Sequence, residues 1–395
     1  MNLKLENLSD QFVFWNLKKI TKGYLELTDY KGKKYYFGDK ESKLKAQIKI
    51  NDPNFTSKII RKGGSALGEC YINNEFTTED LPALIELTAK NVNIIYKFSG
   101  LLNVSIFQNV LNKFINTNTK QRSKKNISAH YDLGNDFFSI WLDKTLTYSC
   151  GIFSHENESL EDAQINKYNK LIELIQPKPG SKILEIGCGW GGFAELIAKN
   201  YDIKLDCITI SKKQYEFTKE KINRLGLNEK VNVKILDYRD LNSKYDNIVS
   251  IEMIEAVGEK YLNKYFKKLK ENLVFGGRAA IQSIVIKDDL YDRYRTKEDF
   301  IQKFIFPGGF LPSFNTIKKI SSQTGLKIDD HKLYGEHYSN TLQQWRKTFL
   351  TSWEKISRQG FNSGFKNMWD FYFSYCEAGF KAKNIDLIQF SLCNK

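Results

Sequence analysis

The sequence predicts an α/β fold, in which a mostly parallel sheet is covered by helices on both faces and a small α+β domain precedes it. Two observations support this prediction. From about residue 182 the chain alternates apolar strand patterns with helical patterns, which is typical of parallel strands joined by crossover helices. The first strand of the series ends in a turn containing Gly187, Gly189 and Gly191, and a helical pattern follows directly. With 395 residues, 41% of them hydrophobic, the chain can fold into two or three domains.

The N-terminal hundred residues predict the small domain. Short strand patterns are separated by turns and stand at residues 24–28, 34–37 and 44–50. A helix is expected near Thr78, with Glu79 and Asp80 in its first turn. Residues 94–114 continue as a helix with an apolar stripe, and the polar, basic stretch after it is typical of a linker. We therefore expect one domain over 1–115, a linker over 116–127 and a second domain over 128–395.

The second domain contains the alternating strands and helices. Strands are expected at residues 182–186, 204–210, 231–236, 247–251 and 278–284, and helices are expected to begin at residues 192, 212 and 260. Sheets of this kind bind ligands beyond the carboxyl ends of their strands. Gly187, Ser211, Asp237 and Glu252 follow four of the strands. The sequence therefore predicts a binding site at that edge of the sheet.

The glycine turn predicts a cofactor that carries a nucleoside. Glycine allows a sharp turn and a close approach of backbone to ligand. A dinucleotide site would need another glycine and an acidic strand end about 20 residues later, whereas the next strand here is followed by Thr209, Ser211 and Gln214. The spacing Glu-x-Gly-x-Gly-x-Gly from Glu185 to Gly191 instead resembles the first motif of S-adenosylmethionine methyltransferases. A tight turn without a ligand is the alternative.

Composition limits the partners and the compartment. The net charge of +14 and the pI of about 9.2 favour an anionic partner, either nucleic acid or an anionic membrane surface, unless the lysines only solvate helix faces. The six cysteines show no Cys-x-x-Cys spacing, so neither a metal site nor a disulfide framework is expected. Charged residues interrupt the first twenty positions, which argues against a signal peptide, and no apolar run is long enough to span a bilayer. We therefore expect reduced thiols and a cytoplasmic location.

Segments on both sides of the glycine motif resemble the cyclopropane-fatty-acid synthases and the related mycolic acid methyltransferases. The matching segments are residues 68–72, 128–138, 141–143, 147–151, 186–191, 208–212, 237–241, 250–258, 304–313, 337–342 and 376–383. They run in the same order over nearly the whole chain, which chance does not produce. The resemblance implies a Rossmann-like class I methyltransferase domain with a seven-stranded, mostly parallel sheet over 128–395. It also implies a lipid- or membrane-associated domain over 1–115.

The family joins the methyl group of S-adenosylmethionine to a cis double bond of a phospholipid acyl chain and closes a cyclopropane ring. This chemistry needs a dry pocket that aligns the methyl group with a weakly nucleophilic alkene. It also needs a base for the carbocation that forms, which in the family is thought to be bound bicarbonate. The resemblance therefore implies S-adenosylmethionine and bicarbonate as cofactors and unsaturated phospholipid chains as substrate. It further implies peripheral attachment to the anionic inner membrane face and no nucleic acid partner. A homodimer is compatible with the resemblance.

The resemblance also assigns the site residues. Bicarbonate would be held by Cys150, Glu255 and Tyr338 with the backbone of Ile284. The cofactor would be bound by Tyr148, Ser149, Glu185, Gly187, Gly189, Gly191, Thr209, Gln214, Tyr238 and Arg239. His130 is expected to order its loop rather than to take part in chemistry. Taken singly, Cys150 could equally be a small buried side chain, Glu255 a carboxylate at a helix start and Tyr338 a packing residue.

The sequence departs from the family pattern at Gln282, where many members have histidine, and at Ala256, where many read Glu-His. Gln282 is still expected among the catalytic residues, because glutamine can donate a hydrogen bond to an anion, although it cannot change charge near neutral pH. Ring closure is therefore less firmly predicted than methyl transfer, and a methyl-branched or methylene product is the first alternative. A small-molecule N-methyltransferase, a lipid-binding protein that has lost catalysis and a nucleic acid methyltransferase are further alternatives. Against the nucleic acid methyltransferase, the chain lacks the Asp/Asn-Pro-Pro-aromatic motif of the enzymes that methylate amino groups of bases.

Overall fold

The structure, a computed structural model, describes residues 3–94, 118–123, 126 and 133–395. The helix expected over 94–114 lies almost entirely outside the described residues, as do His130 and part of the expected linker. The chain forms two compact units. The first comprises Met1–Ile115, Arg293–Ile305 and Trp353–Asn384, and the second comprises Asn116–Asp292, Phe306–Ser352 and Ile385–Lys395. The expectation of one continuous domain over 128–395 is therefore corrected, because two of its segments pack with the N-terminal residues.

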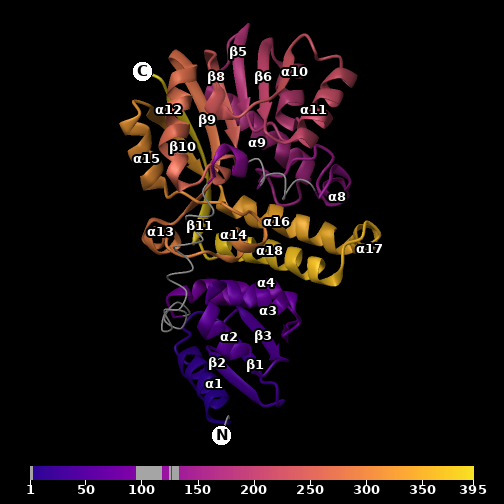
Figure 1. Ribbon diagram of the computed structural model, residues 1–395, viewed down its shortest axis with the longest axis vertical. Coiled ribbons are helices and arrows are strands. Elements are labelled where there is room, and N and C mark those ends of the chain that lie inside the picture. The colour runs from indigo at the N-terminus through magenta and orange to yellow at the C-terminus, as the bar shows by residue number, and fades with distance from the viewer. Residues whose placement is uncertain (1–2, 95–117, 124–125, 127–132) are drawn as a thin grey trace. The chain divides into compact units, whose positions relative to one another are not determined.

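The first unit is built on a four-stranded sheet with the order β2-β1-β3-β4 (Figure 1). Its strands are β1 (Tyr24–Thr28), β2 (Lys34–Gly38), β3 (Lys45–Ile50) and β4 (Phe76–Thr77). Along β3 every second residue is buried, as in a sheet with one covered face. The helices before residue 91 are α1 (Leu3–Leu17), α2 (Phe55–Lys62), α3 (Gly64–Ile72) and α4 (Leu81–Lys90). The helix expected near Thr78 begins at Leu81 because the Asp80 side chain caps it, accepting a hydrogen bond from the Ala83 N–H.

Two later segments complete this unit through aromatic packing. They contribute α14 (Phe300–Phe304), α17 (Trp353–Ser357) and α18 (Ser363–Lys381). The Phe300 and Phe371 rings lie 4.5 Å apart, and the Tyr71 hydroxyl donates to Asp370 at 2.8 Å. At Gly68 an added Cβ would lie 2.2 Å from the Phe300 ring, so only glycine allows α3 to approach α14 this closely. The contacts of Tyr71 with Asp370 and of Gly68 with Phe300 join residues more than 200 positions apart, which explains why the sequence pattern placed these segments in another domain.

The second unit contains a seven-stranded sheet with the order β10-β11-β9-β8-β5-β6-β7 (Figure 1). The strands are β5 (Ser181–Ile186), β6 (Ile203–Thr209), β7 (Val231–Ile235), β8 (Tyr245–Ile251), β9 (Leu273–Ile286), β10 (Lys327–Leu333) and β11 (Ile385–Cys393). Neighbouring strands from β9 to β7 are parallel, and β11 is antiparallel to both of its neighbours. The expected mostly parallel sheet is confirmed, including its five predicted strands. The sequence did not predict β10 and β11.

Seven helices of the described residues surround this sheet, and three of them begin at a serine cap. They are α8 (Asn135–Trp141), α9 (Leu160–Ile175), α10 (Gly192–Asn200), α11 (Lys212–Arg224), α12 (Leu262–Asn272), α15 (Phe314–Gln323) and α16 (Gly335–Thr351). The hydroxyls of Ser159, Ser211 and Ser313 each accept a backbone N–H from the first turn of α9, α11 and α15. The short helix α13 (Asp288–Tyr294) follows β9. An apolar core that includes Leu171, Ile183, Phe193 and Leu205 joins α9 and α10 to the sheet, and this core fixes the turn between β5 and α10.

Part of the expected linker is packed into the second unit. Asn118 is buried, and its side-chain amide donates to the carbonyl oxygens of Ala256 at 3.1 Å and Gly308 at 2.8 Å. Residues 118–123 are thus attached next to the residues that follow β8. Within the part of the chain that the structure describes, no helix has the length and apolar character needed to cross a membrane.

Candidate active site

The turn between β5 and α10 forms a hollow lined by backbone. Gly187, Gly189 and Gly191 all have positive φ, at 84°, 51° and 76°, which side chains rarely adopt. An added Cβ at Gly191 would lie 2.7 Å from the Thr218 side chain, whereas a Cβ at Gly189 would meet no atom of the described residues within 4 Å. Gly191 is therefore needed for packing, and Gly189 faces space that no described residue fills. The N–H groups at the start of α10 border this turn and suit a polar ligand.

The residues around this turn hold its shape. The Glu185 carboxylate at the end of β5 accepts a hydrogen bond from the Cys207 thiol at 3.2 Å, and burial raises the pKa of Glu185 to about 7. The Thr209 hydroxyl donates to the Gln214 side chain at 3.0 Å. The Thr218 hydroxyl donates to the Gly189 carbonyl oxygen at 3.0 Å. The predicted cofactor residues on β5, β6 and α11 are therefore gathered at the carboxyl ends of the strands.

Tyr238 and Arg239 lie in a short 3-10 helix, Tyr238–Asp240, after β7. The Tyr238 ring packs against Tyr265 at 5.3 Å. The Arg239 guanidinium forms an ion pair with Asp237 at 2.6 Å, and it also donates to the Asn118 carbonyl oxygen at 2.9 Å and to the Ser123 hydroxyl. The Arg239 side chain thus attaches residues 118–123 to the sheet edge. The sequence had assigned Arg239 to cofactor binding, and in the structure its guanidinium contacts Asp237 and residues 118–123.

The segment before α9 brings an aromatic wall to the site. The Tyr148 ring lies 5.4 Å from Phe138, 5.4 Å from Trp141 and 5.3 Å from Trp345. Next to it, the Ser149 hydroxyl accepts a hydrogen bond at 2.7 Å from Lys167, which is fully buried. Burial lowers the pKa of Lys167 to about 8, although nearby Glu252 opposes this shift. The wall is thus built of aromatic rings, and a buried cation lies at the residue next to Tyr148.

Glu252 is the centre of a hydrogen-bonded cluster directly after β8. One oxygen, Oε1, accepts from the Cys150 backbone N–H at 2.9 Å and from Gln282 Nε2 at 2.8 Å. The other oxygen, Oε2, accepts from the Tyr338 hydroxyl at 2.5 Å. A second hydrogen bond fixes the orientation of the Gln282 amide, since Gln389 donates to Gln282 Oε1 at 2.9 Å. Burial raises the pKa of Glu252, and the three donated hydrogen bonds oppose that rise.

Glu255 is a second buried carboxyl group three residues further on. Its Oε1 accepts from the Ile284 backbone N–H at 2.5 Å and from the Ser283 hydroxyl at 3.1 Å. Its Oε2 is buried and has no hydrogen-bond partner among the described residues. Burial, reinforced by the negative charge of Glu252, raises the pKa of Glu255 to about 8. Glu255 therefore carries a proton at neutral pH, while Glu252 is the carboxyl group that three donors stabilise as an anion.

The structure brings together the five residues that the sequence assigned to catalysis, namely Cys150, Glu255, Gln282, Ile284 and Tyr338. Cys150 contributes its backbone N–H, because burial raises the pKa of its thiol well above the ordinary value and keeps it protonated. Sequence reasoning missed the roles of Glu252, Lys167 and Gln389. Only Glu252 gave a signal, since it follows a predicted strand at the ligand-binding edge.

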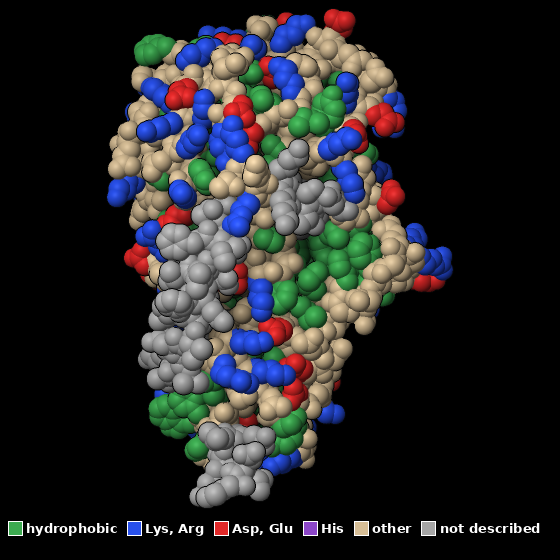
Figure 2. All heavy atoms as spheres, in the orientation of Figure 1, with side chains coloured by type: hydrophobic (Ala, Val, Ile, Leu, Met, Phe, Trp, Pro, Cys, Tyr) green, Lys and Arg blue, Asp and Glu red, His purple; other side chains and the backbone are tan. Residues whose placement is uncertain are grey.

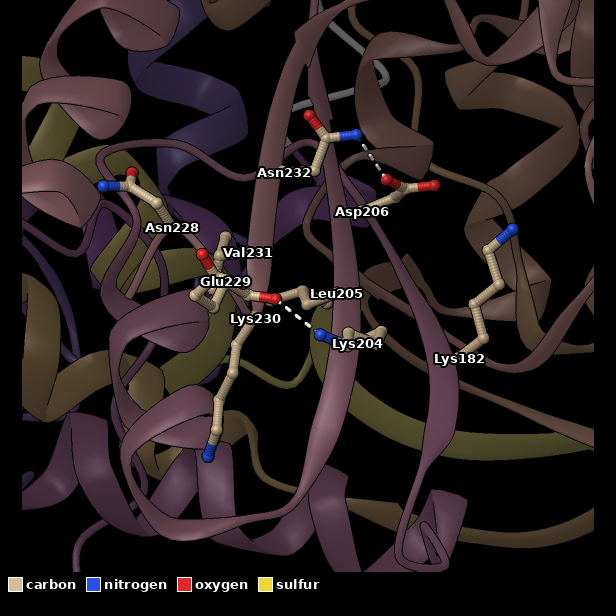
Figure 3. A pocket seen from close by; sticks show the side chains of 9 residues that line it. All are labelled: Lys182, Lys204, Leu205, Asp206, Asn228, Glu229, Lys230, Val231 and Asn232. Carbon is tan, nitrogen blue, oxygen red and sulfur yellow. Dashed lines mark hydrogen bonds between the residues drawn. The ribbon is translucent and has the colours of Figure 1, made fainter. Parts of the chain in front are cut away.

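A hollow of 220 Å³ lies at the opposite edge of the sheet, where β5, β6 and β7 begin (Figure 3). Its lining includes three lysines, Lys182, Lys204 and Lys230. Lys204 donates to the Glu229 carbonyl oxygen at 2.7 Å, and Lys230 donates to two backbone oxygens of residues 198 and 201. The amines of Lys204 and Lys230 are therefore satisfied by backbone oxygens, and parallel sheets bind ligands at their other edge. We assign this hollow no role in the site.

Comparison with known proteins agrees with this geometry. The family model described as mycolic acid cyclopropane synthetase matches residues 118–390. The chain belongs to this family. Among curated proteins, this cyclopropane synthetase family member is 33% identical to the tuberculostearic acid methyltransferase of Mycobacterium tuberculosis, covering 85% of this chain and 80% of that one. It is also 33% identical to the cyclopropane-fatty-acyl-phospholipid synthase of Escherichia coli, covering 87% of each chain.

Solved structures of the family have the same fold. The cyclopropane synthase MmaA2 from Mycobacterium tuberculosis superposes with a TM-score of 0.64 at 27% identity, covering 68% of this chain and 98% of that one. The mycolic acid cyclopropane synthase CmaA1, solved with SAH and CTAB, superposes with a TM-score of 0.63 at 26% identity, covering 68% and 98%. The expected class I methyltransferase fold is therefore confirmed. This synthetase family member is an S-adenosylmethionine-dependent methyltransferase.

Proposed function

We propose that this enzyme transfers the methyl group of S-adenosylmethionine to the cis double bond of an unsaturated phospholipid acyl chain and forms a cyclopropane fatty acid. The observation that carries the proposal is the pairing of an open glycine turn with a buried, hydrogen-bonded carboxylate at one edge of the sheet. The similarity to the Escherichia coli cyclopropane-fatty-acyl-phospholipid synthase over 87% of both chains supports the choice of substrate.

The residues at the glycine turn fit S-adenosylmethionine. The free space at Gly189 allows a ligand to approach the backbone, and the buried Glu185 and the Thr209 and Gln214 pair border the same turn. We assign cofactor binding to these residues with Gly187, Gly191, Tyr148, Ser149 and Tyr238. When bound there, S-adenosylmethionine supplies an electrophilic methyl group.

The aromatic wall fits the reaction on an alkene. Rings at Phe138, Trp141, Tyr148 and Trp345 are packed against one another within 6 Å, which excludes water from their side of the site. Their faces also stabilise positive charge, as in cation–π contacts. A dry pocket of this kind protects a carbocation on the acyl chain from water. The aromatic side chains therefore support a carbocation reaction better than transfer to a polar amine.

The residues expected to hold bicarbonate do not fit that ion. The Cys150 N–H, the Gln282 amide and the Tyr338 hydroxyl donate to Glu252, and the Ile284 N–H donates to Glu255. Each donor of the expected set is thus used by a carboxyl group of the chain itself. We derive no step through bicarbonate.

The first unit supports a role at a membrane surface. Leu8, Trp15 and Tyr36 are each more than half exposed, and the Lys19 ammonium lies 3.2 Å from the Trp15 ring centroid. Basic side chains are spread over the face shown in Figure 2. We propose peripheral attachment to an anionic bilayer on the cytoplasmic side, with tryptophan in the interface and lysines near the lipid phosphates. Sedimentation with anionic vesicles should then weaken as salt is added, and equal binding to neutral vesicles would contradict attachment by charge.

A second candidate is methyl transfer that ends without a ring. The tuberculostearic acid methyltransferase matches this chain at the same 33% identity, which favours this candidate as much as the first. A methylene product needs only the loss of a proton, whereas a saturated methyl branch needs two electrons from a reductant. Purified enzyme with labelled S-adenosylmethionine and phospholipid vesicles tests the shared step. Label should enter cis-unsaturated acyl chains and not saturated ones, and labelling of the head groups would refute the proposal.

A further inference from the structure

The Glu252 carboxylate occupies the set of donors that the sequence assigned to a bound anion. These donors come from separate parts of the second unit, since Cys150 precedes α9, Gln282 is on β9 and Tyr338 is on α16. They converge on Glu252 at 2.9 Å, 2.8 Å and 2.5 Å. Three converging donors form a site for a planar carboxylate-like anion. In this chain the anion is a side chain of the protein.

We propose that Glu252 is the base that takes the proton from the newly added methyl group and that this enzyme works without bicarbonate. The inference rests on the proposed function and concerns the second half of that reaction. The Glu252 carboxylate is thus a catalytic residue, and the groups that donate to it are positioning residues.

The geometry leaves one oxygen of Glu252 able to accept a proton. An ionised carboxylate offers about four acceptor positions. Oε1 accepts two hydrogen bonds, whereas among the described residues Oε2 accepts only from Tyr338. Oε2 therefore keeps a free lone-pair direction. The Tyr338 ring also packs at 6.2 Å against Trp345, and this links Oε2 to the aromatic wall that contains Tyr148.

The backbone at Glu252 gives independent support. Its φ is 49°, in the left-handed region where a residue other than glycine costs about 1 kcal/mol or more. The Glu252 N–H donates to the Gln282 carbonyl oxygen at 2.8 Å, so the strained turn is held against β9. Glycine would adopt this backbone without strain. A strained glutamate at a strand end beside the cofactor turn is the arrangement expected when the side chain is needed for function.

The neighbouring Glu255 has the complementary protonation state. Glu255 keeps its proton at neutral pH, whereas the hydrogen bonds to Glu252 and the buried Lys167 cation favour the ionised form of Glu252. Two carboxyl groups whose surroundings separate their pKa values are typical of an acid and base assignment. Glu252 is therefore the carboxyl group that is ready to accept a proton.

The proposed step balances without another reactant. Methyl transfer uses the π electrons to form a C–C bond while the S–C bond of the donor breaks, leaving a positive charge on the other alkene carbon. Glu252 Oε2 then takes a proton from the added methyl group. The electron pair of that C–H bond closes the ring and cancels the charge, and Glu252 becomes a neutral acid that must lose its proton before the next turnover.

Two substitutions test this role. Glu252→Gln keeps the shape and one acceptor oxygen but removes the base, and Glu252→Gly removes the side chain while suiting φ of 49°. Gln176→Gly is the matched control, because Gln176 is exposed and also has φ of 49°. Glu216→Gln, on the exposed face of α11, controls for loss of a carboxylate. Each variant is assayed for methyl transfer to cis-unsaturated vesicles in buffer freed of carbon dioxide, with and without added bicarbonate or formate.

We expect the wild-type rate to be the same with and without bicarbonate. Glu252→Gln should lower kcat by about 100-fold or more, as for loss of a general base, with unchanged S-adenosylmethionine binding by calorimetry. Glu252→Gly should be equally slow and should regain activity when bicarbonate or formate fills the space. Without any turnover, 13C-labelled bicarbonate should show exchange broadening by NMR with Glu252→Gly and none with the wild type. Both controls should match the wild type.

Several results would overturn the inference while leaving the proposed function intact. These are a wild-type enzyme that needs bicarbonate, a Glu252→Gln variant that keeps the wild-type rate, or a variant that loses cofactor binding together with activity. If Glu252→Gly does not fold, the Glu252→Gln rate and the bicarbonate dependence of the wild type still decide the question. A wild-type enzyme that labels no acyl chain would instead refute the proposed function.

Discussion

The Tyr338 hydroxyl donates a 2.5 Å hydrogen bond to the Glu252 carboxylate across the edge of the seven-stranded sheet. Tyr338 is on α16 and Glu252 directly follows β8, so 86 residues of chain separate the two partners. This contact places α16, and with it Trp345 of the aromatic wall, beside the strand ends. The orientation of the base and the position of the wall that excludes water are therefore linked through one hydroxyl group.

Tyr338→Phe should slow turnover while leaving cofactor binding intact. A hydrogen bond to a charged group is worth ~1.5 to 3 kcal/mol, which corresponds to about 10-fold or more in rate. Tyr334→Phe, just before α16, is the control and should keep the wild-type rate. The measurement is kcat on cis-unsaturated vesicles together with calorimetry of S-adenosylmethionine. A Tyr338→Phe enzyme with the wild-type kcat would show that this hydroxyl does not position the base.

Gly189→Val should abolish cofactor binding, because its side chain would enter the free space at the glycine turn. Gly226→Val is the matched control, since Gly226 also has positive φ and an added Cβ there would meet no described atom within 4 Å. Both substitutions should destabilise the fold by ~1 to 3 kcal/mol through backbone strain. Calorimetry should detect S-adenosylmethionine binding only in the control and the wild type. Equal affinity in the two variants would mean that the cofactor binds elsewhere.

Gln282→Leu should slow methyl transfer by about 10-fold or more, because it removes a donor to a charged carboxylate. It also removes the nearer of the two acceptors of the Gln389 amide, so the melting temperature should fall as well. Gln282→His can still donate to Glu252 and should retain more activity than Gln282→Leu. Kinetics and thermal unfolding of both variants check this. A fully active Gln282→Leu enzyme would remove Gln282 from the site.

The proton on Glu255 predicts a pH dependence of stability. The pKa of Glu255 is about 8 in the folded protein against an ordinary value of 4.5, so the folded state binds the proton more tightly. Between these two values the unfolded chain loses this proton while the folded protein keeps it, and stability falls as pH rises. The melting temperature of Glu255→Gln should therefore lie above that of the wild type at pH values over 8. The gain in melting temperature should be smaller at pH 5. A gain that is the same at both pH values would contradict a raised pKa.

The sequence predicted the parts of the fold that depend on local pattern. The strand before Gly187, the start of α11 and the strand ends that carry Glu252 and Asp237 follow from spacing alone. The attachment of α18 to α3 and α4 was not predictable in this way, because it depends on contacts such as Tyr71 with Asp370 between distant residues. The β11 strand was also missed, since Gln389 and Ser391 interrupt its apolar run although both are buried.

In the site, too, some features follow from local sequence motifs and others depend on contacts between distant residues. The motifs predicted that Cys150, Gln282 and Tyr338 would meet around an anion. They could not predict that the anion is Glu252, because this depends on φ of 49° at one residue and on the approach of three separate segments. A tertiary arrangement of this kind leaves no periodic pattern in the sequence.

The most direct test of the central claim is mass spectrometry of acyl chains after turnover with S-adenosylmethionine that carries a trideuterated methyl group. The proposed reaction removes one deuteron to a base and closes the ring, so cis-unsaturated phospholipid chains should gain a carbon that keeps two of the three deuterium atoms. Ring position should be confirmed by fragmentation. A carbon that keeps all three deuterium atoms would contradict ring closure, and unlabelled acyl chains would contradict the proposed function as a whole.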